Sequence, residues 1–293
     1  MSRIKLSKTL QSANLQARGV LALMQKNIEI MHQADARIVY EARSPKEAAQ
    51  LFLKSGRPIM GSSTKVELGE GFGYMTSVLY ISPAKLAGYE VCAGRSAACT
   101  KSCLSHKSGN LVFHQAGAVF KSWLAKYYPS DFNAAVQAEL TKEKNKADRL
   151  GFKMAVRLNG TSDKVWSELW AWAQAQDIRC YEYTKLRGML SRTDGVHRTY
   201  SISEDIESFN TGMAFVKAGF NASIVLPSRA ADKALAIEAL ASYVTIEDGD
   251  QHDLRFLDAA GSVAYLKAKG IPSDDPLVFD AMKIHRYARA CGL

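Results

Sequence analysis

The 293-residue sequence predicts an α/β protein with a mostly parallel sheet, arranged as a partial TIM-like barrel and preceded by an N-terminal helical segment. Short apolar runs alternate with helical stretches from residue 74 onward, which is the pattern of βαβ units. Several of these runs are apolar on both faces, as expected for strands buried between layers of helices. We therefore expect a helical segment over residues 1–60 and an α/β domain over residues 61–293.

The N-terminal segment begins with apolar residues at helical spacing over 5–35, which predicts a helix there. A second helix is predicted in "RSPKEAAQLFLKSG", because Ser44 can cap it, Pro45 suits its first turn and Gly56 can end it. The glycine-rich stretch after it, over 58–73, has no phosphate-loop lysine and is interpreted as a loop.

The α/β domain is predicted from alternating strands and helices. The expected strands lie at 74–83, 152–158, 178–184, 198–203, 222–227 and 243–248, with a further candidate at 262–270. The expected helices lie at 110–127, 131–149, 164–176, 204–218 and 229–241. The number of βαβ units suits either an open sheet or a partial barrel, and we favour the barrel.

The composition limits the cellular setting. No run of about 18 apolar residues occurs, so no membrane span is expected. The N-terminus is basic and lacks the apolar core of a secretory signal, so we expect a cytoplasmic protein. Five cysteines, an odd number, in a reducing compartment indicate free thiols or metal ligands rather than disulfides.

The net charge of +9 permits a nucleotide or nucleic-acid partner without requiring one. The basic residues are scattered, and their densest zone, over 121–157, also contains acidic residues. For that zone we favour a solvated helix face over a nucleic-acid surface. The sequence does not indicate an oligomeric state.

Polar residues follow the predicted strands at the point where each strand ends. "NGTSD" follows the strand at 152–158, Lys185 follows the next strand, Glu204 follows the third, and "DGDQHD" follows the strand that ends at 248. Ligands of parallel α/β folds bind at the carboxyl ends of the strands, so these groups are expected to share one rim. Each segment is also a good turn or helix cap, which is the structural alternative.

Within this rim we assign roles by residue chemistry. Asp163 or Asp250 would orient a polar cofactor or substrate group, and Lys185 would bind a phosphate or carboxylate or donate a proton. The predicted catalytic residues are Asp163, Lys185, Asp250 and His252. The predicted cofactor or substrate contacts are Arg157, Asn159, Thr161, Ser162, Tyr183 and Glu204.

The stretch "VCAGRSAACTKSCLSHKSGN" contains Cys92, Cys99 and Cys103, with His106 three residues later. Three thiolates suit an iron–sulfur cluster with one open iron, and three thiolates with His106 suit a closed zinc site. Free thiols are the third interpretation. The position after the first strand favours a [4Fe–4S] cluster by analogy with radical S-adenosylmethionine enzymes, and S-adenosylmethionine is then a candidate cofactor. The usual C-x3-C-x2-C spacing of those enzymes is absent.

Several segments resemble a family of phage- and plasmid-encoded proteins described as "gene product 88"-like, which has no assigned activity. The matching segments are "CAGRSAACTKSC", "VRLNGTSDKVW", "YEYTK", "TYSISE", "GFNASIVLP" and "DGDQHDLRFLDAAGSVAYLKAKG", in order over about 90–270. The residue after the last cysteine, Leu104, is a minor departure. The resemblance implies a phage or mobile-element source, hence the host cytoplasm, and supplies no reaction.

Three functional hypotheses follow. The first is an iron–sulfur enzyme, similar to radical S-adenosylmethionine enzymes, that acts on a nucleotide or nucleic acid. The second is a zinc-stabilised nucleic-acid-binding or regulatory protein without catalysis. The third is a metal-free protein that binds a host factor.

Overall fold

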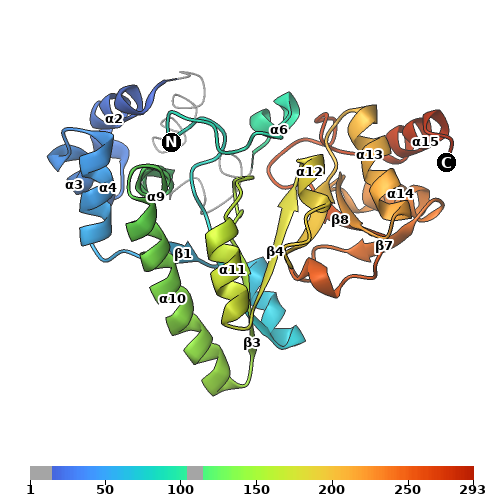
Figure 1. The fold of residues 1–293 in the computed structure, drawn as a ribbon. Helices are drawn as coiled ribbons and strands as arrows, with labels where there is room; N and C mark the ends of the chain where they lie inside the picture. The colour runs from blue at the N-terminus through green and yellow to red at the C-terminus, as the bar shows by residue number, and fades with distance from the viewer. Residues whose placement is uncertain (1–14, 104–114) are drawn as a thin grey trace.

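The computed structural model describes residues 15–103 and 115–293, and its centre is a mostly parallel sheet (Figure 1). The strands are β1 (Met60–Gly61), β2 (Tyr74–Leu79), β3 (Lys153–Arg157), β4 (Ile178–Thr184), β5 (His197–Ser201), β6 (Asn221–Leu226), β7 (Thr245–Asp248) and β8 (Ser262–Lys267). Their spatial order is β1-β2-β3-β4-β5-β6-β8-β7, and only the β1–β2 pair is antiparallel. The α/β prediction is confirmed, including the candidate strand at 262–270. In the described part of the chain the sheet is open, with β1 and β7 at its edges.

The N-terminal segment is helical, but the single helix predicted over 5–35 is wrong for the residues that are described. Helix α2 (Ala17–Gln25) ends near Asn27, and α3 (Gln33–Glu41) begins after a short 3-10 turn, η1 (Ile28–Ile30). Asn27 leaves the helical conformation, with φ −127° and ψ 29°, and its side-chain amide donates to the Leu23 carbonyl. Asparagine competes in this way with the helical backbone bonds, which a count of apolar positions does not register.

Helix α4 (Pro45–Lys54) begins as the sequence predicts. The Ser44 hydroxyl accepts from the Glu47 backbone N–H, and the Glu47 carboxylate accepts from the Arg43 N–H. Pro45 occupies the first turn, and Gly56 has a φ of +65°, a conformation that glycine adopts without strain.

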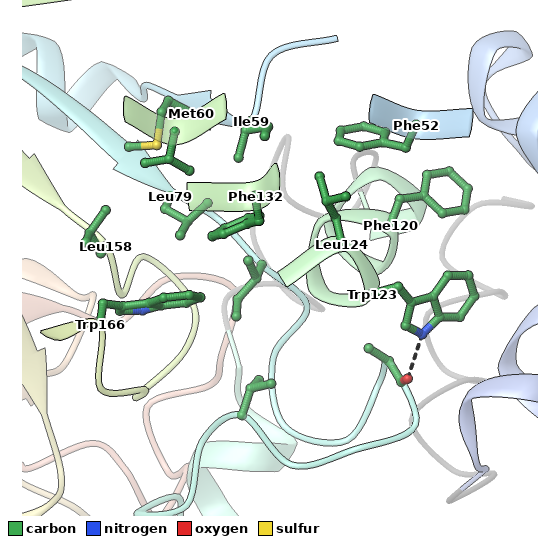
Figure 2. Packing of buried hydrophobic residues seen from close by; sticks show 14 of the residues in the cluster. Phe52, Ile59, Met60, Leu79, Phe120, Trp123, Leu124, Phe132, Leu158 and Trp166 are labelled. Atoms are coloured by element: carbon green, nitrogen blue, oxygen red, sulfur yellow. Dashed lines mark hydrogen bonds between the residues drawn. The ribbon is translucent and has the colours of Figure 1, made fainter. Parts of the chain in front are cut away.

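Two groups of helices cover the outer face of the sheet. Helices α9 (Gln115–Tyr127), α10 (Pro129–Leu150) and α11 (Ser167–Ala175) pack with α2 to α4 in one apolar core beside β2 to β4. Figure 2 shows part of this core, in which the rings of Phe132 and Trp166 stack with centroids 5.5 Å apart. Helices α13 (Ile206–Lys217), α14 (Ala230–Ala241) and α15 (Ala281–Ala290) form a second core beside β6 and β8.

Several short elements lie outside the sequence prediction. They are β1, α5 (Thr64–Glu67), η2 (Leu68–Phe72), α12 (Arg187–Leu190), η3 (Arg255–Leu257) and α15. The interpretation of 58–73 as a loop is therefore wrong, because β1, α5 and η2 lie within it. None of the helices in the described residues is both long enough and apolar enough to cross a membrane.

We call the opposite side of the sheet, which carries Tyr74, Ala155 and Tyr181, the inner face. These three residues pack with Leu254 and Phe256 in a small separate cluster. The Phe256 ring lies edge-on to Tyr74 and Tyr181, with centroids 5.0 and 5.5 Å apart. The segment 249–261, which joins β7 to β8, therefore covers part of the inner face, and we call it the covering segment.

His197, on β5, also lies on the inner face, since it pairs in register with Tyr181. Burial, and then the charges of Arg179 and Arg255, lowers the pKa of His197 from 6.5 to about 4. The folded state therefore favours the neutral ring, and the associated stability is complete above pH 6.5 and is lost as the pH falls towards 4.

We expect the wild-type protein to lose about 2 kcal/mol more unfolding free energy than His197→Gln between about pH 8 and about pH 5. Urea denaturation at a series of pH values measures this difference. Parallel pH profiles for the two proteins would contradict the assignment to His197.

Candidate functional site

The cysteine loop lies at the carboxyl edge of the sheet, directly beside the "NGTSD" segment. Cys92 forms a parallel bridge with Asp163, and the Asp163 N–H donates to the Val91 carbonyl at 2.9 Å. The short helix α6 (Ala97–Lys101), which carries Cys99, lies near the end of the sheet towards which β4 points (Figure 1). The predicted meeting of these two segments at one rim is confirmed.

The three thiols of this loop are close enough to influence one another. The pKa of Cys92 is raised to about 12, mainly by burial and in smaller part by negative charge at Cys103 and Cys99. The Cys92 sulfur accepts from the Ala84 N–H at 3.3 Å and donates to the Thr161 carbonyl at 3.4 Å. Cys92 is therefore a protonated thiol in this arrangement, placed between the cysteine loop and "NGTSD".

Two carboxylates far along the chain hold helix α6 in place. Glu204, just after β5, accepts from the Ser96 hydroxyl and from the Ala98 N–H. Ser96 in turn caps α6 by accepting from the Cys99 N–H at 3.1 Å. At the other end, the buried Ser102 hydroxyl donates to Asp275 at 2.6 Å. The position of Cys99 is thus fixed by residues of β5 and of the C-terminal region.

Lys185, at the end of β4, points into the same region. Its ammonium donates to the carbonyl and the hydroxyl of Ser201, each at 3.1 Å. Burial lowers the pKa of Lys185, while the negative charges of Cys99, Glu204 and Asp163 partly offset that effect. The predicted site residues Lys185, Asp163 and Glu204 and the cysteine loop are therefore brought together.

Asp163 links the end of β4 to the cysteine loop. Its carboxylate accepts from the Thr184 hydroxyl at 2.8 Å and from the Lys185 N–H at 2.9 Å. Burial raises the pKa of Asp163, and these hydrogen bonds oppose the shift. The cysteine loop and the end of β4 come closest at Gly94, where an added Cβ would lie 3.0 Å from the Cβ of Lys185. A side chain at position 94 would push the two segments apart.

Asn159 organises the "NGTSD" segment from inside. Its amide nitrogen donates to the Lys164 carbonyl and to Glu182, and its oxygen accepts from Ser162, Lys164 and Trp166. Thr161 donates to the Ile81 carbonyl. The segment is therefore a turn held by internal hydrogen bonds, which occupy the side chains of Asn159, Thr161 and Ser162. Neither Ser162 nor Asp163 caps a helix, since α11 begins at Ser167.

A second polar cluster lies on the inner face, around Asp253. Its carboxylate accepts from Arg157 at 2.6 Å, from Tyr181 at 3.1 Å and from Tyr183 at 3.4 Å, and it pairs with Lys65 at 3.3 Å. Burial opposes the ionisation of Asp253, but Arg157 and Lys65 outweigh burial and hold its pKa well below the usual range. We call these five residues the Asp253 cluster.

Arg157 connects the Asp253 cluster to the rim. Besides its bond to Asp253, its guanidinium donates to the carbonyls of Asn159 and Gly160. The guanidinium also lies over the Tyr183 ring, 4.9 Å from its centroid. The predicted contact residues Arg157 and Tyr183 therefore line the inner face and anchor the covering segment.

Asp250 and His252 were predicted to line the same rim as the cysteines. Asp250 lies at the carboxyl edge of the sheet, since its partner Lys267 is the last residue of β8, whereas His252 contacts Phe72, which precedes β2. The Asp250 carboxylate accepts from the Lys267 N–H, and the His252 ring accepts from the Leu254 N–H. The His252 ring also contacts Phe72, with centroids 4.3 Å apart. Both residues belong to the covering segment, because the chain after β7 turns back over the inner face.

The thiols of the cysteine loop suit a metal by their chemistry, but the described side chains do not form a metal site. Three sulfurs that influence one another have the right chemistry for a thiophilic metal. Yet among residues 15–103 and 115–293 no group of three or more His, Cys, Asp or Glu is arranged to hold a metal ion. His106, the proposed zinc ligand, lies outside the described residues.

The structure adds residues that the sequence reasoning missed. They are Lys65, Ser96, Tyr181, Ser201, Asp253 and Asp275. Asp253 lies inside the "DGDQHD" motif and could have been chosen there. Ser96 has a local signal, since it caps α6, whereas Lys65, Tyr181, Ser201 and Asp275 act through partners far along the chain.

Comparison with known proteins gives one family. A family model described as Gene product 88 matches residues 51–292. The match includes the cysteine loop, "NGTSD", Lys185 and the covering segment. No curated protein and no solved structure matches the chain.

Proposed function

The chain belongs to the Gene product 88 family, and we propose that it is an iron–sulfur enzyme whose cluster is bound by Cys92, Cys99 and Cys103. The observation that carries the proposal is the convergence of the thiols with Lys185. Cys92 responds to the charges of Cys99 and Cys103, and Lys185 responds to the charge of Cys99. When bound, such a cluster would supply electron transfer or an open iron site. For Cys92 to bind the cluster, its thiol would have to lose its proton and give up its hydrogen bond to the Thr161 carbonyl.

The residues around the thiols then have distinct tasks. Lys185 presents a half-buried cation near Cys99, suited to binding a phosphate or carboxylate of a substrate. Its lowered pKa also suits it to donate a proton. Asp163 keeps the Lys185 backbone in place, and Glu204 keeps α6 in place.

We assign the substrate to the nucleotide and nucleic-acid class. The net charge of +9 favours a polyanionic partner, and the family is of phage type. Lys185 at the rim would receive a phosphate of such a substrate. S-adenosylmethionine is a candidate second ligand of the same rim.

The proposal is tested by purifying the protein without oxygen and measuring iron, acid-labile sulfide and zinc. We expect a brown protein with iron and sulfide in stoichiometric amounts. A colourless protein with stoichiometric zinc would favour the closed zinc site with His106 instead. A protein without either metal, even after reconstitution with iron and sulfide, would favour the metal-free interpretation.

Glu204→Gln tests whether this carboxylate positions the cysteine helix. Hydrogen bonds to a charged group contribute about 1.5–3 kcal/mol each, so losing the charge should release α6. We expect Cys99 to be alkylated about tenfold faster in the reduced, metal-free variant than in the wild type. Mass spectrometry of the modified peptide measures this rate.

Glu207→Gln is the matched control, since Glu207 forms an exposed pair with Arg187 near the same strand end. That variant should leave the alkylation rate of Cys99 unchanged. Equal rates in the Glu204 and Glu207 variants would remove the positioning role.

A further inference from the structure

Unpartnered polar atoms gather on the inner face of the sheet. The described residues contain nine buried side-chain nitrogen and oxygen atoms without a hydrogen-bond partner. One of them belongs to Ser82, away from this face. The other eight belong to Thr76, His197, Thr199, Asn221, Arg255, Asp258 and Ser262. Buried polar groups are nearly always satisfied in native proteins, so this concentration requires an explanation.

The strand register places most of these residues on one side. Thr199 pairs with Asn221 between β5 and β6. Ala222 pairs with Val263, so Asn221 lies beside Ser262. Thr199 follows His197 by two residues and so shares its face. We call Thr199, Asn221 and Ser262 the polar row; their exposed fractions are 0%, 4% and 0%.

The covering segment brings Arg255 and Asp258 to this region. Arg255 is fully buried, and its Nη1 lies 3.1 Å from Asp258 in an ion pair without hydrogen-bond geometry. Its Nη2 is used by the carbonyl and ring of His252. The charge of Arg255 also lowers the pKa of His197, so the two side chains lie in the same region. The two residues of the covering segment and the strands β5, β6 and β8 thus enclose one set of unsatisfied groups.

We propose that several internal water molecules are bound between the covering segment and the sheet, satisfying the polar row, Arg255 and Asp258. Bulk solvent does not reach these atoms, and leaving all of them dry would cost more than the net stability of an ordinary domain. The set contains both fixed donors, on Arg255 and Asn221, and acceptors, on Asp258. Water serves both kinds, and buried waters typically make two to four such bonds.

A single bound oxyanion fits this set less well. The open Nε and Nη1 groups of Arg255 do not share one edge of the guanidinium, because Nε forms its fork with Nη2. The positive charge of Arg255 is already matched by Asp258. Several small neutral ligands therefore suit the geometry better than one anion. This inference does not depend on the proposed iron–sulfur function.

The test compares substitutions of the same shape. Thr199→Val removes a hydroxyl that, in this proposal, binds internal water, so we expect the thermal midpoint to fall by roughly 2–4 °C. Ser82→Ala is the control, because it removes a buried unpartnered hydroxyl away from the inner face and should leave the midpoint equal or higher. A crystal structure that resolves ordered solvent should show waters within hydrogen-bond distance of Ser262, Asn221 and Arg255.

Two results would overturn the proposal. A higher midpoint for Thr199→Val would mean that the hydroxyl is buried dry, because removing an unsatisfied group stabilises a protein. A small organic molecule or anion released on denaturation and identified by mass spectrometry would mean that a solute, rather than water, occupies the region.

Discussion

Replacing Cys99 with serine should abolish stoichiometric binding of iron and sulfide while leaving the fold intact. A cluster held by three thiolates of the chain needs all three for binding, and serine is a poor ligand for thiophilic iron. Cys99 is half-buried on the short helix α6 and belongs to none of the apolar cores, so the substitution should disturb packing little. We expect the iron content of anaerobically purified Cys99→Ser to fall several-fold below that of the wild type. Circular dichroism should be unchanged.

Cys291→Ser provides the matched control for this result. Cys291 is also half-buried, but it lies in the C-terminal tail beside the second apolar core. Its substitution should leave iron and sulfide at wild-type levels. Equal metal content in both variants would show that the bound metal does not depend on the cysteine loop. The radical-type chemistry suggested by the position of the loop would then lose its basis.

The sequence was sufficient for most of the sheet, because parallel strands buried on both faces are read as continuous apolar runs between helices. Helix α15 was not predicted, although its sequence is amphipathic and carries recognisable helix signals. Its signals were an N-cap at Asp280, which accepts from the Lys283 N–H, and two buried residues four apart, Ile284 and Ala288.

The rim of the candidate site was predictable for a topological reason. Parallel strands end at one edge, so residues that follow β2, β3, β4 and β5 must meet there. The rule placed Cys92, Asp163, Lys185 and Glu204 together correctly. It failed for His252 because it assumes that the chain stays at the carboxyl edge after each strand, whereas the chain after Asp250 crosses the inner face.

The failure has a physical cause in the β7–β8 connection. These neighbouring parallel strands are joined by a segment with only a short 3-10 turn, η3, and this segment crosses the inner face. Its anchor is the contact between Asp253 and Arg157, residues 96 positions apart. No local sequence pattern predicts the contact between Arg157 and Asp253, because each residue by itself resembles an ordinary surface charge.

Among substitutions on the inner face that keep the shape of the side chain, Asp253→Asn should be the most destabilising. Asp253 is 3% exposed, and its carboxylate compensates both Arg157 and Lys65. Removing one member of a buried ion network typically costs about 3–5 kcal/mol, because the remaining charges are left without a partner. We expect a loss of unfolding free energy in this range, measured by urea denaturation. Glu207→Gln, which breaks an exposed pair, should cost less than about 1 kcal/mol.

A double substitution separates lost charge compensation from lost packing. Lys65→Met removes one of the two cations while keeping an apolar stem of similar length. If the cost of Asp253→Asn is electrostatic, adding Lys65→Met should recover part of it, which gives a coupling energy of at least about 1 kcal/mol between the two positions. Additive effects would instead mean that Asp253 acts mainly through its hydrogen bonds to Tyr181 and Tyr183. In the electrostatic case, Asp253→Asn leaves the half-buried Lys65 ammonium without the carboxylate of its ion pair, and Lys65→Met removes that uncompensated charge.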